Sequence, residues 1–129
     1  MASQTSHLKQ AEHNHELANE LASQEPIKYI DWVITILFYA TVHYFESYWA
    51  NSGIHSDDHK DRKINIERFF NRDVGIRSKY KTLSNNCWLV RYLNKDVTNS
   101  DIAISYFDEK DINDFFNKVH EIKTALKIN

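Results

Sequence analysis

The feature that most limits how this chain can fold is a long and almost continuously apolar stretch at residues 27–51. Between residues 32 and 45 it holds eleven apolar or aromatic side chains, and it carries no formal charge there apart from the titrating His43. A helix that is apolar on nearly every side needs a packing partner on each side, so it belongs in the middle of a bundle. Charged residues near both ends leave it short of the roughly 18 uninterrupted apolar residues that a membrane span requires.

One line of polar side chains runs along this stretch. It consists of Asp31, Thr35, Tyr39, His43 and Glu46, at spacings of four, four, four and three residues. In an α-helix such spacings stack the side chains on one side. We therefore expect this line either to face water or to form the wall of a binding site.

The composition favours long helices over strands. The chain has two Gly and one Pro, whereas an all-β domain needs many turns and uses far more of both. Its 129 residues are enough for one domain with a proper core and too few for two. We predict an all-α, up-and-down bundle of four long helices plus a short additional segment, in a single domain covering residues 1–129.

Turn and capping residues set the expected helix limits. Pro26 suits the first turn of the central helix, and Gly53 suits a left-handed cap at its far end, which gives about 26 residues and about 39 Å. Thr5 or Ser6 is the expected cap of the first helix. The other helices are expected at residues 6–23, from Ser56, Asp57 or Asp58 to about 71, at about 76–94, and from Asp108 or Asp111 onward, with a short turn or extended segment near 100–107.

Charge and cysteine content narrow the environment and the partners. The net charge is −2, so no overall field attracts nucleic acid or an acidic membrane, although a local basic patch remains possible. The single Cys87 excludes an intramolecular disulfide, and no N-terminal apolar segment resembles a signal peptide. These features predict a cytoplasmic protein without membrane attachment.

The first helix places polar residues among its apolar ones. His7 and Asn14 fall on the side that also carries Leu8 and Ala11. Asn14 either meets water at the edge of this side or faces the polar line of the central helix.

Several short motifs resemble those of the HEPN superfamily, small helical-bundle domains found in prokaryotic toxin and defence systems and beside nucleotidyltransferases. The central helix carries FYATVH at residues 38–43, then an alanine-bearing end and a glycine, followed by SDDH at 56–59. YxxL at 80–83 and LVRY at 89–92 resemble the segment that precedes the last helices of such domains. The resemblance covers nearly the whole chain. It implies a HEPN-like module that binds or acts on RNA or a nucleotide, in a toxin–antitoxin or defence setting.

The chain lacks the usual ribonuclease motif of that superfamily. HEPN ribonucleases carry an arginine followed four to six residues later by a histidine, and they cleave RNA across a dimer without a metal. None of the five arginines here has a histidine at that distance. The resemblance therefore implies either a non-cleaving member or one whose chemistry lies elsewhere.

Three residues are candidates for metal-independent RNA cleavage, namely His43, His59 and Arg62. The reaction needs a base, an acid and a cation for the phosphate; imidazoles suit the first two near neutral pH, and a guanidinium suits the third. His59 and Arg62 fall near the expected start of the third helix, where backbone N–H groups favour an anion. Further candidates for ligand binding are Asn14, Asp31, Tyr39, Glu46 and His55.

Two other interpretations use the same residues. A metal site would combine His55 and His59 with Asp58 or Glu46, but His55 precedes the helix and no cysteine cluster supports it, so we predict no metal and no cofactor. Alternatively, His43 is a buried histidine bonded to a neighbouring helix, and the chain is a non-catalytic structural or partner-binding subunit.

The aromatic residues of the central helix predict self-association. Trp32, Tyr44, Tyr48 and Trp49 exceed what a few short helices are expected to cover, and uncovered aromatic area often marks an interface. HEPN-like domains commonly pair in this way. We therefore predict a homodimer.

Overall fold

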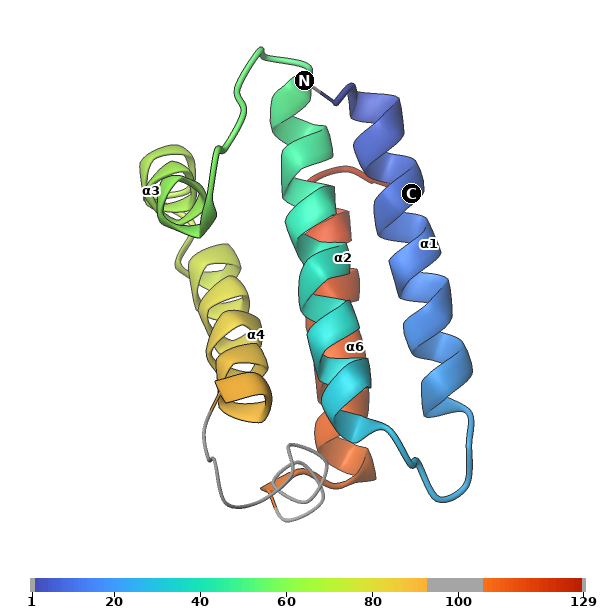
Figure 1. The fold of residues 1–129 in the computed structure, drawn as a ribbon. Coiled ribbons are helices and arrows are strands. Elements are labelled where there is room, and N and C mark those ends of the chain that lie inside the picture. The colour runs from blue at the N-terminus through green and yellow to red at the C-terminus, as the bar shows by residue number, and fades with distance from the viewer. Residues whose placement is uncertain (1, 93–105, 129) are drawn as a thin grey trace.

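The structure, a computed structural model, describes residues 2–92 and 106–128. The predicted all-α class is confirmed for this part of the chain, in which helices are the only regular elements (Figure 1). The helices are α1 (Gln4–Ala22), α2 (Ile30–Ala50), α3 (His59–Phe69), α4 (Val74–Tyr92) and α6 (Glu109–Ala125). None of them has the length and apolar character needed to cross a membrane.

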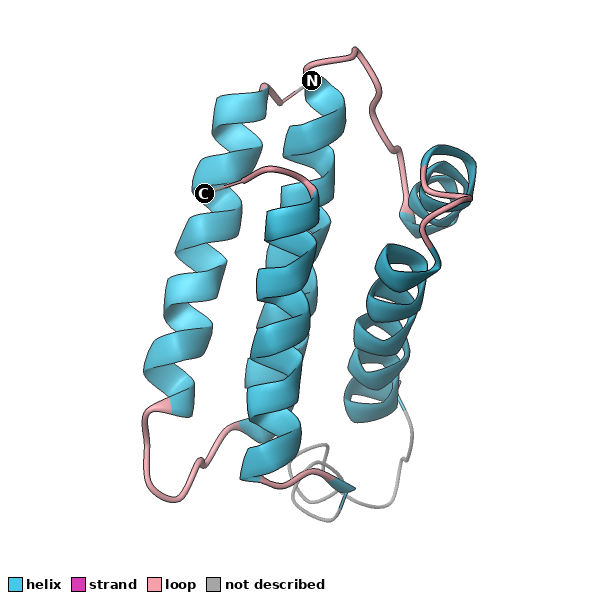
Figure 2. Cartoon of the chain, turned by 180° about the vertical axis from the view of Figure 1, so that it is seen from behind, coloured by secondary structure: helices cyan, strands magenta, loops and turns pink. Residues whose placement is uncertain are grey.

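Helix α2 occupies the centre, as its composition predicted. It packs against α1, α4 and α6, and 15 of its 21 residues are buried. Helices α1 and α2 run antiparallel, α4 lies on the other side of α2, and α6 lies along its back (Figures 1 and 2). Helix α3 is seen nearly end-on in Figure 1, so it runs across the direction of the others.

The end of α2 is as predicted, but its start is not. Gly53 has a φ of 71°, and its N–H donates to the Ala50 carbonyl at 3.1 Å while the Ile54 N–H donates to the Trp49 carbonyl, the bonding pattern of a left-handed glycine cap. At the other end Pro26 lies four residues before the helix begins. Ile27 lies in the connecting loop and packs against the core, and α2 is shorter than expected.

Acidic and hydroxyl side chains cap four of the helices. Of the three residues proposed to open α3, the cap is Asp58, which accepts from the Asp61 N–H at 2.8 Å. Asp108 opens α6 through a reciprocal pair of bonds with Asp111, as predicted.

Helix α1 begins earlier than expected, because Ser3 rather than Thr5 or Ser6 accepts the cap bond. Helix α4 also starts early, because the Asp73 carboxylate accepts from the Ile76 N–H. Most of the segment expected near 100–107 lies outside the described residues.

The prediction that the neighbouring helices do not cover all four aromatic side chains of α2 is confirmed, because two of the four remain exposed. Tyr44 and Trp49 are 0% and 2% exposed, because α2 is enclosed on those sides within a single chain. Trp32 and Tyr48 are 53% and 42% exposed. The exposed aromatic area of α2 therefore comes from Trp32 and Tyr48.

A buried ion pair fixes α3 to α2. Arg62 Nε donates to Glu46 Oε1 at 3.1 Å, and the side chains are 10% and 6% exposed. The other Glu46 oxygen accepts from the Ser56 N–H at 3.3 Å, which also ties down the loop before α3. Apart from Arg62, the one buried residue of α3 is Ile66. The position of α3 therefore depends strongly on this charge pair.

Removing one partner of the pair should cost much more than removing an exposed charge. We expect Glu46→Ala and Arg62→Ala each to lower the free energy of unfolding by about 3–5 kcal/mol, because the remaining charge is left buried and unpaired. Urea denaturation of both variants and of the double variant measures this cost. Glu121→Ala, which removes the exposed pair with Lys79, is the control and should cost less than about 1 kcal/mol. Equal losses for Glu46→Ala and Glu121→Ala would contradict a structural role for the buried pair.

Candidate functional site

The polar line of α2 does not stay together on one face. A step of four residues turns an α-helix by about 400°, so each of the first three steps shifts the side chain by about 40°, and the final step of three residues shifts it back by about 60°. Asp31 and Thr35 are buried near the start of α2, where the Thr35 hydroxyl donates to the Asp31 carbonyl at 2.8 Å. Tyr39 and His43 are half-buried, and Glu46 is buried against α3. The line therefore reaches three different neighbours.

Tyr39 joins the start of α3 to the end of α4. Its hydroxyl accepts a hydrogen bond from Arg91 Nη1 at 3.0 Å, and the Arg91 guanidinium lies over its ring at 5.9 Å. The imidazole of His59 lies 6.3 Å from the same ring, measured between centroids. A histidine, a phenol and a guanidinium from three helices thus meet at one place.

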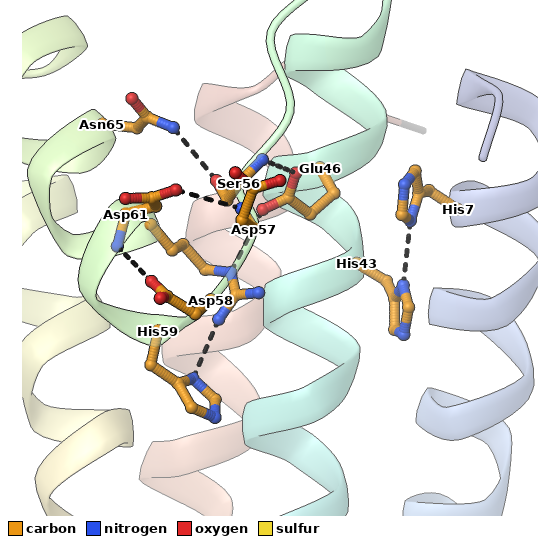
Figure 3. A network of polar contacts seen from close by, with 10 residues as sticks. His7, His43, Glu46, Ser56, Asp57, Asp58, His59, Asp61 and Asn65 are labelled. Atoms are coloured by element: carbon orange, nitrogen blue, oxygen red, sulfur yellow. Dashed lines mark hydrogen bonds and ion pairs between the residues drawn. The ribbon is translucent and has the colours of Figure 1, made fainter. Parts of the chain in front are cut away.

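His59 is held in one tautomer by Arg62. Arg62 Nη1 lies 2.9 Å from His59 Nδ1, and a guanidinium has no acceptor atom, so Nδ1 must accept and the ring proton must be on Nε2. Figure 3 shows the second ring nitrogen turned away from this bond. Burial, and then the nearby Arg62 charge, lower the pKa of His59. His59 is therefore neutral with its N–H on Nε2; the ring is partly buried, while the residue as a whole is exposed.

The positive charge of Arg62 is neutralised within the protein by an ion pair with Glu46. Its Nε is bonded to Glu46 and its Nη1 to His59, and its side chain is buried. The guanidinium thus orients His59 while being neutralised by Glu46.

His43 faces α1 and pairs with His7. The two Nδ1 atoms lie 3.0 Å apart, so one of them must donate and the other accept (Figure 3). Burial is the main cause that lowers the pKa of each ring. The neighbouring His7 is the next cause for His43, whereas for His7 the charge of Glu46 opposes the shift. In the neutral pair, one Nε2 carries a proton and the other a lone pair.

The remaining predicted residues lie apart from one another. The side chain of Asn14 accepts from Gln10 Nε2 on its own helix at 2.9 Å, and the described structure gives it no bond to the polar line. His55 is half-buried in the loop before α3, and its charge contributes to lowering the pKa of His7. Asp31 Oδ1 is buried and has no hydrogen-bond partner among the described residues.

Sequence reasoning did not identify two members of the site. The spacing of the first helix puts His7 on its inward side, but the pairing of His7 with His43 depends on how α1 packs against α2. Arg91 belongs to the LVRY segment at 89–92, and nothing in that segment indicates its contact with Tyr39. An inward-facing histidine opposite a second inward-facing histidine is the signal that could have suggested the first pair.

The described residues contain no cluster of side chains that could bind a metal ion. Within 2–92 and 106–128, no group of three or more histidine, cysteine, aspartate or glutamate side chains is arranged to hold a metal ion.

Comparison with family models, with curated proteins and with solved structures gives no match to this chain.

The lowered histidine pKa values predict a loss of stability on acidification. In the unfolded chain these rings titrate near pH 6.5, whereas in the folded chain they resist protonation to lower pH. The unfolded state therefore binds more protons below about pH 6.5, and the free energy of unfolding falls as the pH is lowered through this range. Urea denaturation at about pH 7.5 and about pH 5 should show a smaller loss for His43→Gln than for the wild type. His13→Gln, which replaces an exposed histidine of α1, is the control and should show the wild-type loss. Identical losses in all three proteins would contradict this assignment.

Proposed function

We propose that this chain is a HEPN-like helical module that binds RNA or a nucleotide, in the setting of a prokaryotic toxin or defence system. The observation that carries the proposal is the group formed by Tyr39, His59 and Arg91, in which His59 is held as an N–H donor beside a guanidinium. Phosphate oxygens accept from such donors, and an aromatic ring beside them suits a nucleobase. The resemblance to HEPN domains supplies the choice of ligand.

Binding accounts for this group better than cleavage does. A general base needs an available lone pair, and the Nδ1 lone pair of His59 is taken by Arg62. Arg62 is in turn neutralised by Glu46, which reduces its value for stabilising a phosphate. The group therefore suits recognition of a phosphate.

The alternative function, a metal-independent endoribonuclease, is favoured by a different observation. His7 and His43 form a neutral pair that offers one protonated and one unprotonated Nε2. The unprotonated Nε2 is the base that cleavage next to a 2′-hydroxyl requires, and the acid would be the imidazolium formed when the pair takes up one proton. In this version His43 acts with His7, and His59 binds the phosphate.

A homodimer is part of the proposal, with a revised interface. Leu17 of α1 and Trp32 of α2 are 38% and 53% exposed, and Tyr29 just before α2 is also exposed. Leu21 and Ile36 line a shallow surface together with Tyr29 and Trp32. These five residues, named here the α1–α2 strip, form an apolar surface of the kind that pairs with a second copy. In the remaining alternative, the chain is a non-catalytic subunit and the same strip binds a different protein.

The RNA proposal is tested with a labelled oligoribonucleotide in the presence of EDTA. We expect the wild type to retain RNA and His59→Ala to bind about tenfold more weakly, because a hydrogen bond to a charged phosphate is lost. His13→Ala, at an exposed position on α1, should bind like the wild type. Cleavage that persists in EDTA and disappears in His7→Ala or His43→Ala would establish the ribonuclease instead. A wild type that neither retains RNA or a nucleotide nor cleaves RNA would leave the partner-binding subunit.

The interface is tested by measuring the molar mass in solution by light scattering. We expect the wild type to be a dimer and Trp32→Glu to be a monomer, because a charge placed within a buried apolar interface disfavours association. Ile64→Glu changes an exposed apolar residue of α3 outside the strip and should remain dimeric. A monomeric wild type, or loss of the dimer only in Ile64→Glu, would contradict the α1–α2 strip as the interface.

A further inference from the structure

Positive charge is concentrated in one part of the chain. Residues 59–92, which comprise α3, α4 and the turn between them, contain nine Lys or Arg against three Asp or Glu. Their net charge is +6 within a chain whose net charge is −2. The overall value therefore hides a strongly basic segment next to acidic ones.

A cleft between α3 and α4 gathers several of these cations. Its volume is about 440 Å³, and Lys63 of α3 and Arg77 and Lys81 of α4 contribute its charged lining. Neutral hydrogen-bonding groups are added by Ser84 and Asn85. On α4 these positions follow at intervals of about one helical turn, so they share a face. A cleft of this size is in the range of small-molecule sites.

The cations of the cleft are not neutralised by acidic partners. Among residues 2–92 and 106–128, Lys63, Arg77 and Lys81 form no ion pair, whereas the neighbouring Lys79 turns to Glu121 of α6. Arg77 Nε is buried and has no hydrogen-bond partner in the same part of the chain. A buried cationic N–H without an acceptor is costly, and a bound anion offsets that cost.

The cleft between α3 and α4 carries more positive than negative side chains. Glu67 is the one acidic side chain that lines it in the described structure, so three cations face one carboxylate. Lys63 also follows His59 by one turn of α3, so the two side chains project from neighbouring positions on the same side of that helix. A ligand with several phosphates could contact both.

We propose that the cleft between α3 and α4 binds phosphate groups of RNA or of a free nucleotide. The choice of ligand rests on the proposed function, while the cleft itself is defined by Lys63, Arg77 and Lys81. Guanidinium and ammonium groups hold the phosphate oxygens, and the hydroxyl and amide groups beside them donate further hydrogen bonds.

Binding to the full-length chain is measured with a labelled oligoribonucleotide at several salt concentrations. The variant Lys63→Gln/Arg77→Gln/Lys81→Gln should bind at least about tenfold more weakly, and its plot of log Kd against log salt should have a slope smaller by about two or three. The matched control Lys9→Gln/Lys28→Gln/Lys110→Gln removes the same charge from exposed positions outside the cleft. It should keep the wild-type slope. Equal weakening of the two triple variants would overturn the proposal, as would tighter binding of polyglutamate than of RNA.

A second measurement does not depend on RNA binding. In ¹⁵N-labelled protein, titration with inorganic pyrophosphate should shift the Nε–Hε signal of Arg77, which is identified by its loss in Arg77→Lys. ATP should shift it as well if a free nucleotide is the source of the phosphate. A shift without any RNA retention would preserve the cleft and leave RNA excluded as its ligand. An Arg77 signal unmoved by pyrophosphate and by ATP would overturn the cleft even if the group around His59 binds RNA.

Discussion

The arrangement of the candidate site depends on one buried charge pair, Glu46 with Arg62. Helix α3 buries little apolar surface of its own, so hydrophobic packing alone positions it weakly. Burying two charges costs much of what their attraction returns, and the pair is favourable only when its other hydrogen bonds are satisfied. Here the Ser56 N–H completes Glu46, and His59 accepts a second bond from Arg62. The same contacts that satisfy the pair therefore orient His59 and set the course of α3.

The fold followed from local patterns to a large extent. An almost wholly apolar helix had to be central, and Asp58, Asp108 and Gly53 mark helix ends through bonds made within a few residues. Pro26 was misleading because it is permitted at the start of a helix but does not require one there. In the folded chain Ile27 packs against the core from the loop before α2, and a contact of this kind depends on tertiary structure.

The site was less predictable, because its partners come from different helices. A spacing of four residues looks like one face over a single turn but drifts around the helix over several. Tyr39 consequently contacts Arg91 of α4, while His43 contacts His7 of α1. Helical spacing showed that these side chains point out of one helix. The packing of α1 and α4 around α2 decided which residues they meet, and no spacing within α2 contains that information.

Charge illustrates the same limit on a finer scale. Arg62 and Lys63 are adjacent in the sequence and carry the same charge. Their side chains nevertheless point about 100° apart around the helix axis, so they contact different neighbours. Arg62 points to α2 and is neutralised by Glu46, whereas Lys63 lines the cleft shared with α4. The number of Lys and Arg residues in α3 therefore overstates the positive charge that is available to bind a phosphate. Because the buried pair fixes the rotation of α3, it also determines that Lys63 faces Arg77 and Lys81. A single internal ion pair thus links the orientation of His59 to the composition of the basic cleft.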